Sequence, residues 1–400
     1  MRILFVADVP IETPVSGSEQ VLFHQAVGMR RGGETIWAIS RKYDTRFRES
    51  IVKFRGIRGA CCHLDHNRYL RTFPVLLKYG FRWFNFIREK GDIDAVVAHQ
   101  PMILFSLLMT GRLFNIPITY VCHSPWHEEY LHQDETLRPG AASLIRRVLE
   151  LVCLRRADRI VVLSRYMKRK IIQIHNLRGD RIDVNPGGID LLHFTPLEDR
   201  FDYKERLKLP KGCVHLLTVR NLEPRMGLDR LLQAMNQLKG HRIPFHLTIA
   251  GKGPESRLLW RMVKELRLDE TVSMVGFVPT EQLPQYYGAT DFFVLPTRHL
   301  EGFGLVTLES MACGTPVLGT PVGGTIEILS GFDSEFIFQD TSPRAIANGI
   351  VQAVRSYAPT SVEYLNLRSR CREYVASNFS WHRHVNQLSA TVRDTLNRDR

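Results

Sequence analysis

A regular alternation of short apolar runs with helical stretches constrains the fold of this chain more than any other feature. One series of apolar runs covers residues 3–9, 35–41, 95–99, 118–123, 159–164 and 182–184, and a second covers residues 215–220, 245–251, 272–277, 292–297, 316–320 and 335–338. Most runs are continuously apolar, which is typical of parallel strands covered on both faces. Amphipathic stretches such as 227–238 lie between them. Strand–helix alternation predicts doubly wound α/β sheets.

Two successive series predict two Rossmann-like domains, and 400 residues suit two domains of about 150–200 residues each. The change-over is expected at the polar, proline-broken segment 194–200. We therefore expect one domain over 1–195, a second over 196–375, and a C-terminal helix over 376–400 that packs back on the first domain. Ligands of open α/β sheets bind beyond the carboxyl ends of the strands, so we expect the site in a cleft between the domains.

Cysteine usage and apolar stretch lengths bear on the compartment. Seven cysteines show no CxxC pair, which is typical of reduced thiols in the cytoplasm. The longest apolar stretch, 102–109, is shorter than the roughly 20 residues that span a bilayer. Met1 and Arg2 lead straight into an apolar run without a separate signal-peptide region. These features predict a cytoplasmic protein that is soluble or peripheral on the inner face of the membrane.

The net charge of +13 is concentrated in residues 1–195, which carry +10 of it. Residues 68–88 interleave aromatic side chains with Lys and Arg, and residues 138–170 hold ten basic residues against two acidic ones. Such segments suit an anionic membrane surface or a helix half buried against its own domain. Nucleic acid is a third candidate, but no RNA- or DNA-binding motif accompanies the charge, so no nucleic-acid partner is expected.

The segment from Glu301 to Val317 carries the most chemical information. Gly302 and Gly304 free the backbone to approach a ligand, and the helix that opens near Leu305 presents unpaired N–H groups to an anion. Glu301 and Glu309 supply carboxylates, which accept paired hydroxyl groups of a sugar or a ribose. An ordinary capped helix with acidic residues is the alternative interpretation.

This segment resembles the E-x7-E motif of retaining glycosyltransferases with the GT-B fold, most closely those of family 4. The resemblance spans nearly the whole chain in order and is denser after residue 180. It also includes Gly17-Ser18-Glu19, Cys122-His123-Ser124, and the segments 186–190, 217–220, 225–227, 250–254, 275–278 and 320–327. It implies transfer of a hexosyl unit from a nucleotide diphosphate sugar (a UDP-sugar or GDP-mannose) to a hydroxyl acceptor. A glycan or lipid-linked acceptor in cell-surface polysaccharide or glycolipid synthesis fits this implication.

The resemblance also implies roles for two cations. Arg220 and a nearby second cation should clamp the pyrophosphate, because the leaving nucleoside diphosphate gains negative charge in the transition state. The chain departs from the family here, since Met226 occupies the place of the usual lysine. Arg225 is the candidate replacement. An ion pair between Arg225 and Glu223 on a surface loop is the alternative.

For the other donor contacts, the resemblance places His123 near the transferred sugar and Gly17 and Ser18 near the donor phosphates and the acceptor. Glu301 should orient the sugar and Glu309 should hold the ribose. The remaining expected donor-binding residues are Gly251, Phe277, Val278, Gly302, Phe303, Gly304 and Leu305. The family favours front-face transfer in which the leaving phosphate helps to deprotonate the acceptor, and no protein nucleophile is expected.

Neither a metal nor a cofactor is expected. Asp92-Ile93-Asp94 has the DxD form of metal-binding glycosyltransferases of another fold, but it precedes a strand and is interpreted as a solvated strand entry. Pro125 argues against a zinc site formed by His123, His127 and His132 with Glu128 and Glu129. Gly251-Lys252-Gly253 lacks the third glycine of a dinucleotide fingerprint. A nucleotide-sugar epimerase and a non-catalytic sugar-nucleotide-binding subunit remain alternatives.

Overall fold

The computed structural model describes residues 1–12, 14–42, 49–63, 77–78, 81–82, 84–85, 87–89, 91–133 and 138–398. Internal contacts divide the chain into two units. Unit 1 comprises Met1–Glu128, Pro139–Gly187 and Trp381–Arg400, and unit 2 comprises Glu129–Arg138 and Gly188–Ser380. Apart from the segment Glu129–Arg138, the chain changes unit at 187/188 and 380/381, against the 195/196 and 375/376 expected from the sequence.

Unit 1 is built on an eight-stranded sheet in the order β3-β4-β2-β1-β5-β6-β7-β8. The strands are β1 (Arg2–Ala7), β2 (Thr35–Lys42), β3 (Glu49–Phe54), β4 (Ile57–His63), β5 (Ala95–His99), β6 (Ile118–Cys122), β7 (Arg159–Val162) and β8 (Ile182–Val184). Every neighbouring pair is parallel except the hairpin of β3 and β4. Strands β5 and β6 are buried along their whole length, as their apolar sequences predict.

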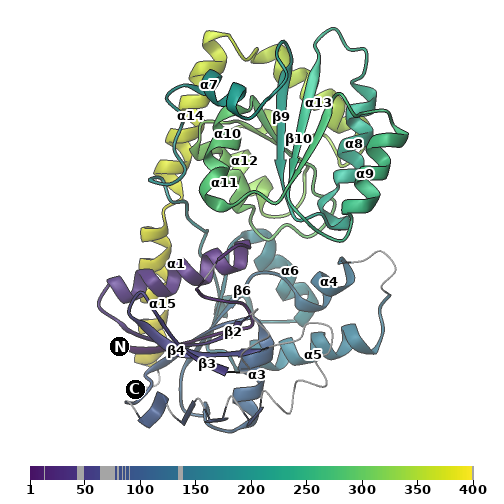
Figure 1. Cartoon of the computed structure of the whole chain (residues 1–400). Helices are drawn as coiled ribbons and strands as arrows, with labels where there is room; N and C mark the ends of the chain where they lie inside the picture. Colours follow the sequence, from purple (N-terminus) through teal and green to yellow (C-terminus); the bar gives the residue numbers. More distant parts are fainter. Residues whose placement is uncertain are drawn as a thin grey trace. The chain divides into compact units, whose positions relative to one another are not determined.

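Helices cover both faces of this sheet (Figure 1). Helices α1 (Gly17–Arg31) and α15 (Trp381–Arg398) pack together on one face, while α3 (Pro101–Met109) and α5 (Ala141–Arg156) pack together on the other. Gly28 permits the close approach of α1 and α15, because a Cβ atom there would lie 2.6 Å from Val385 Cγ2. The unit is completed by α4 (Trp126–Leu131) and α6 (Arg165–His175).

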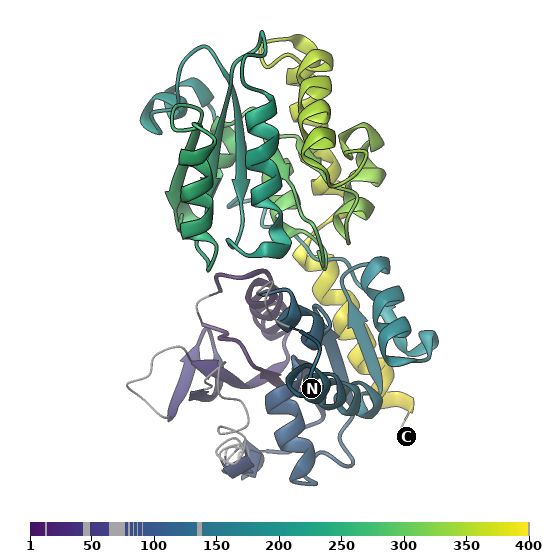
Figure 2. The ribbon, with the colours of Figure 1, turned by 90° about the vertical axis from the view of Figure 1, so that its right-hand side faces the viewer.

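Unit 2 is built on a fully parallel five-stranded sheet in the order β11-β10-β9-β12-β13. The strands are β9 (Val214–Val219), β10 (Phe245–Ala250), β11 (Val272–Gly276), β12 (Phe292–Leu295) and β13 (Val317–Gly319). Helices α8 (Leu228–Gln237), α9 (Ser256–Glu265) and α13 (Pro343–Ser356) form one helical layer (Figure 2). The other layer holds α10 (Leu283–Ala289), α11 (Leu305–Ala312) and α14 (Val362–Asn378), and α7 (Arg200–Arg206) and α12 (Thr325–Phe332) complete the unit. The predicted pair of Rossmann-like doubly wound domains is confirmed.

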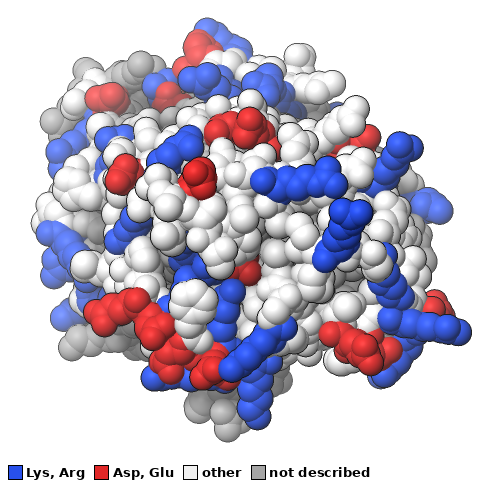
Figure 3. All heavy atoms as spheres, turned by 90° about the horizontal axis from the view of Figure 1, so that it is seen from above, with Lys and Arg blue, Asp and Glu red and all other residues white. Residues whose placement is uncertain are grey.

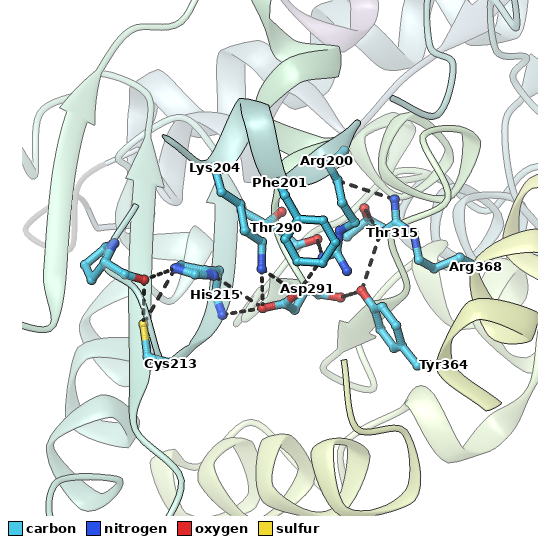
Figure 4. A network of polar contacts seen from close by, with 12 residues as sticks. Arg200, Phe201, Lys204, Cys213, His215, Thr290, Asp291, Thr315, Tyr364 and Arg368 are labelled. Atoms are coloured by element: carbon cyan, nitrogen blue, oxygen red, sulfur yellow. Dashed lines mark hydrogen bonds and ion pairs between the residues drawn. The ribbon is translucent and has the colours of Figure 1, made fainter. Parts of the chain in front are cut away.

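A buried carboxylate anchors α7 to the sheet of unit 2. Asp291, 1% exposed, accepts hydrogen bonds from Arg200 at 2.5 Å and from Lys204 at 3.0 Å (Figure 4). The backbone N–H of His215 donates to the same carboxylate at 2.8 Å. The carboxylate thus ties α7 to β9, because a buried charge is stable only when it is paired and hydrogen-bonded.

Two local features differ from the sequence prediction. The strand expected at 335–338 is wrong: Asp333 accepts a hydrogen bond from the N–H of Glu335 and starts a 3₁₀ turn over Ser334–Phe336. Only an isolated bridge from Ile337 to Gly319 remains there. The hairpin of β3 and β4 was not predicted, and it turns at Arg55 and Gly56, which both have positive φ.

Candidate active site

The predicted residues of unit 2 gather at one edge of its sheet, where all five parallel strands end. The order β11-β10-β9-β12-β13 means that the chain leaves β9 and β12 toward opposite sides. A crevice opens at such a switch point, and ligands of doubly wound sheets bind there. Arg220 directly follows β9, and Glu301 lies in the loop after β12. The switch point of unit 2 therefore lies between Arg220, which is assigned to the donor phosphate from the sequence, and Glu301, which is assigned to the sugar.

Arg220 and Glu301 form an ion pair at this switch point. Nη2 of Arg220 lies 2.6 Å from Oε2 of Glu301 and 3.3 Å from Oγ1 of Thr297, and it also contacts Sδ of Met226. Arg220 is 8% exposed, yet its buried Nε atom bonds to no described residue. Because a buried N–H without a partner is costly, this atom is a ready hydrogen-bond donor for an anionic ligand.

The glycine turn before α11 is lined by two unpaired hydroxyl groups that the sequence did not single out. Gly304 caps α11 with a φ of +94°, a conformation that favours glycine. A Cβ atom there would lie 2.4 Å from Thr325 Oγ1 and 3.3 Å from Thr307 Oγ1. Both hydroxyl groups are buried and bond to no described residue. Together with the helix N-terminus, they form a set of hydrogen-bond donors suited to phosphate oxygens.

Glu309 lies about one turn further along α11, where its carboxylate accepts a hydrogen bond from the Tyr287 hydroxyl at 2.8 Å. Burial raises the pKa of Glu309 from 4.5 to about 7, against the lowering effect of Tyr287. The carboxylate is therefore partly protonated near neutral pH. Hydroxyl groups that donate to it stabilise its ionised form, as expected for a ribose ligand.

Arg225 lies in a 3₁₀ turn before α8 and is engaged within unit 2. Its Nε atom donates to Glu223 at 2.9 Å, and Nη1 donates to the carbonyl of Leu300 at 2.9 Å. The pair with Glu223 is the alternative interpretation from the sequence, although the side chain of Arg225 is only 15% exposed. The bond to Leu300 holds Arg225 against the loop that carries Glu301.

The outer strands place the remaining predicted residues at the same sheet edge. Gly251 follows β10 with a φ of +142°, and a Cβ atom there would lie 1.8 Å from the carbonyl oxygen of Arg220. Phe277 follows β11 and is 47% exposed, with Lys252 Nζ 4.8 Å from its ring centre, while Val278 is buried. Phe303 is 5% exposed and packs on Phe379, so its backbone and not its ring is available to a ligand.

In unit 1, Gly17 and Ser18 form the first turn of α1 and not a free loop. Ser16 caps this helix in a capping box with Glu19, whose carboxylate accepts the N–H groups of Val15 and Ser16 at 2.6 and 2.9 Å. The box leaves the N-terminus of α1 well ordered at the carboxyl edge of the sheet, after β1. That position suits an anionic group.

His123 follows β6 and belongs to a buried chain of hydrogen bonds. Its Nε2 atom lies 2.9 Å from His99 Nδ1, and His99 Nε2 lies 3.0 Å from Gln25 Oε1. Gln25 Nε2 lies 2.8 Å from His384 Nε2 on α15. Burial, together with the charge that His384 would carry, lowers the pKa of His123 to about 4, so His123 is neutral at pH 7.

The metal-binding patterns that were considered and rejected from the sequence lie outside this site. Asp94 accepts the N–H of Arg2 at 2.7 Å, while Asp92 is exposed. Among the described residues, His127, Glu150 and His175 form one cluster with metal-ligand spacing. Glu150 already accepts the N–H of Trp126 with both oxygens and lies 3.1 Å from His175 Nε2, so hydrogen bonds within unit 1 account for the cluster.

Comparison with known proteins identifies the chain. The family model for glycosyl transferases group 1 matches residues 199–377, and the model for glycosyltransferase family 4 matches residues 15–192. The D-inositol 3-phosphate glycosyltransferase of Mycolicibacterium smegmatis is 30% identical over 322 residues, which cover 75% of this chain and 70% of that protein. The chain belongs to the group 1 glycosyltransferases. The D-inositol 3-phosphate glycosyltransferase of Acidothermus cellulolyticus is 28% identical, and the match spans 66% of this chain and 60% of that relative.

Solved structures place the glycosyltransferase in the GT-B fold, as its sequence predicts. A sucrose-phosphate synthase from Thermosynechococcus elongatus superposes with a TM-score of 0.82 at 21% identity, over 100% of both chains. HepE of Anabaena in complex with UDP-glucose superposes with a TM-score of 0.75 at 18% identity, over 98% of this chain and 100% of HepE. Within the described part of the glycosyltransferase, no helix is both long and apolar enough to cross a membrane.

Proposed function

We propose that this glycosyltransferase moves a hexosyl unit, with retention of configuration, from a UDP-sugar or GDP-mannose to a hydroxyl acceptor. The observation that carries the proposal is the Arg220–Glu301 pair at the switch point, beside an unpaired Arg220 Nε. The relatives support it, because they include D-inositol 3-phosphate glycosyltransferases and, at 26% identity, a putative colanic acid biosynthesis glycosyltransferase of Salmonella typhimurium. A glycan or lipid-linked acceptor of cell-surface polysaccharide or glycolipid synthesis agrees with these names.

In this proposal different residues of unit 2 bind different parts of the donor. Arg220, the N-terminus of α11 and the hydroxyl groups of Thr307 and Thr325 bind the pyrophosphate. Glu309 accepts the ribose hydroxyls, and the backbone at Phe277 and Val278 meets the base. Bound phosphate draws Arg220 away from Glu301, whose carboxylate then accepts hydroxyl groups of the sugar. His123 of unit 1 contacts the transferred sugar.

The chemical step needs no protein nucleophile. The bond from the anomeric carbon to the phosphate oxygen breaks while the bond to the acceptor oxygen forms on the same face of the sugar. The acceptor proton passes to an oxygen of the leaving phosphate. Arg220, with Arg225 as a proposed second cation, stabilises the negative charge that develops there.

We also propose an anionic membrane surface as a partner of unit 1, through α5. This helix buries Cys153 and Leu154 together with the polar Ser143 and Glu150, but it exposes four apolar side chains along one stripe, those of Leu144, Ile145, Val148 and Val152. Its other charged residues are the arginines 146, 147, 155 and 156, so the only carboxylate of the helix is a buried one. Phe114, 82% exposed, lies close to the C-terminal end of α5, where its carbonyl accepts a hydrogen bond from Arg156.

Nucleic acid is not proposed as a partner. Figure 3 shows Lys and Arg side chains interspersed with Asp and Glu on the face that it draws. Residues 68–76, the first part of the basic and aromatic segment 68–88, lie outside the described residues, and they carry no part of the membrane proposal. Sedimentation with phosphatidylglycerol vesicles tests the α5 surface. We expect binding by the wild type and loss of binding in Leu144→Glu/Val148→Glu, while binding by that variant would contradict the proposal.

The transferase proposal is tested by incubating the enzyme with UDP-glucose and GDP-mannose, with and without EDTA, and measuring release of UDP or GDP. We expect release from one of the two donors that continues in EDTA. Release from neither donor contradicts the proposal. Activity restored only by Mg²⁺ or Mn²⁺ contradicts the metal-free mechanism and implicates Asp92 and Asp94.

A further inference from the structure

In the buried chain of hydrogen bonds in unit 1, the donor and the acceptor of each bond can be assigned. The chain starts at the carbonyl of Pro186, which lies 2.9 Å from His384 Nδ1. A carbonyl oxygen only accepts, so the proton of neutral His384 is on Nδ1 and its Nε2 is an acceptor. The Nε2 amide group of Gln25 must therefore donate to His384 Nε2, at 2.8 Å. This requirement leaves Gln25 Oε1 directed at His99.

The same logic carries on to His123. Gln25 Oε1 only accepts, so His99 carries its proton on Nε2 at 3.0 Å and presents Nδ1 as an acceptor. His123 must then donate from Nε2 to His99 Nδ1, at 2.9 Å. The proton of neutral His123 is thereby placed on Nε2, and its Nδ1 atom keeps a lone pair. Among the described residues, no group bonds to that Nδ1 atom.

Burial keeps the histidines of this chain neutral, so the assignment of donors and acceptors is not changed by protonation. Gln25 and His99 are 0% exposed, and His384 is 1% exposed. Burial lowers the pKa of His384 to about 4, despite the carbonyl of Pro186, and it lowers the pKa of His99 well below its ordinary value. A flipped Gln25 amide would set an oxygen against the lone pair of His384 and an N–H group against the N–H of His99. Only one arrangement satisfies every member.

We infer that Gln25, His99 and His384 are positioning residues that fix the tautomer of His123, so that its free Nδ1 atom accepts a hydrogen bond from a ligand hydroxyl. A neutral acceptor at this point favours a sugar hydroxyl and disfavours a carboxylate or phosphate oxygen, which would leave two acceptors facing each other. The inference rests on the proposed function for the identity of the ligand. The tautomer itself is independent of that proposal.

The test is a long-range ¹H–¹⁵N correlation spectrum of the ¹⁵N-histidine-labelled enzyme at pH 7, which distinguishes the two neutral tautomers. We expect Nε2–H in His99 and His123 and Nδ1–H in His384. Gln25→Met removes both hydrogen bonds at similar volume, and we expect His123 to become a mixture of tautomers. Gln25→Glu still accepts from His99, so it should keep the tautomers of His99 and His123 and disturb His384 alone. Gln387→Met, an exposed glutamine of α15, is the matched control.

Kinetics add a second measurement with UDP-glucose as the probe. Gln25→Met should lower kcat about tenfold with unchanged UDP affinity, and Gln25→Glu should recover most of that loss. A wild-type His123 that carries its proton on Nδ1, or an unchanged His123 in Gln25→Met, overturns the inference. The wild-type spectrum alone decides if Gln25→Met does not fold. Absence of both UDP and GDP binding to the wild type contradicts the proposed function and leaves the tautomer result standing.

Discussion

Arg220 and Glu301 are separated by 2.6 Å between Nη2 and Oε2, and they join the ends of neighbouring strands β9 and β12. In the structure each group therefore neutralises the other. A donor has to replace this pair by two new contacts, one from phosphate to Arg220 and one from sugar to Glu301. The two residues should for that reason differ in their effect on nucleotide binding.

Glu301→Gln should abolish transfer while UDP or GDP binds at least as tightly as to the wild type. The substitution releases Arg220 from its carboxylate, but it removes the acceptor that orients the sugar. Arg220→Ala should weaken nucleotide binding itself, because a charge-assisted hydrogen bond is worth about 1.5–3 kcal/mol. Calorimetric titration of both variants checks this. Equal weakening of nucleotide binding in the two variants would contradict the exchange of partners.

Donor affinity should depend on pH through Glu309. The folded enzyme raises the pKa of this carboxyl group to about 7, and ribose hydroxyls that donate to it favour its ionised form. Affinity should thus fall as the pH drops below 7, by up to about tenfold per pH unit, and level off above it. Glu309→Ala should bind more weakly and lose this dependence. A flat profile in the wild type would remove Glu309 from the ribose site.

Substitution of Tyr287 provides a control for the titration of the Glu309 carboxyl group. Its hydroxyl lowers the pKa of Glu309, so Tyr287→Phe should shift the affinity profile to higher pH without abolishing binding. An unshifted profile would show that another group titrates.

Arg225→Ala should reduce the transfer rate more than it reduces stability, if Arg225 takes the place of the family's lysine. Loss of an electrostatic contact to the leaving group costs about 3–4 kcal/mol of barrier. Arg225 donates a hydrogen bond to Glu223 in the structure, so Glu223→Gln should leave the rate intact or raise it. Transfer rate and melting temperature are measured on both variants, and near-wild-type turnover in Arg225→Ala would leave Arg220 as the sole assigned cation.

Met226→Lys in the Arg225→Ala background asks whether the usual lysine can restore the lost rate. Met226 is 5% exposed and touches Arg220, so the new ammonium group would lie beside the guanidinium. We expect partial recovery of the rate at some cost in stability. A rate no higher than that of Arg225→Ala alone would contradict the substitution of one cation by the other.

Much of the fold could be predicted because the parallel strands are buried on both faces and therefore read as continuous apolar runs. The hairpin of β3 and β4 was missed because its turn at Arg55-Gly56 is not one of the common turn pairs. The segment 335–338 is apolar like a strand, but Asp333 turns it instead. The hydrogen bond to Asp333 thus determines the local structure more than the apolar composition of residues 335–338 does.

The residues of the candidate site could be named from the sequence where a motif contains them, as at Glu301, Gly304 and Arg220. The partners of motif residues could not be named, because side-chain contacts join residues far apart in the chain. Gln25 and His384 are 359 positions apart, and nothing local to either marks the bond between them. Thr307 and Thr325 lie within the motif segments 301–317 and 320–327, yet only the turn at Gly304 shows that their hydroxyl groups face the same place.

The polar anchor of α7 predicts how stability depends on pH. Burial alone would lower the pKa of His215, but the Asp291 carboxylate, 3.4 Å from His215 Nδ1, raises it to about 9, above the 6.5 of the unfolded chain. The stabilisation is therefore complete below pH 6.5 and is lost as the pH rises through 9. Urea unfolding of wild type and His215→Gln should differ by about 3 kcal/mol at pH 6 and by much less at pH 9.5. Equal differences at both pH values would contradict this assignment.

The central claim is that unit 2 binds a nucleotide diphosphate sugar at the switch point of its sheet. The most direct measurement is calorimetric titration of UDP-glucose and GDP-mannose into the wild type and into Arg220→Ala, with Arg230→Ala on the outer helix α8 as the matched arginine control. The account predicts saturable binding of one donor by the wild type and by Arg230→Ala, and weakening of at least tenfold in Arg220→Ala. Donor binding that is equally tight in Arg220→Ala would contradict it.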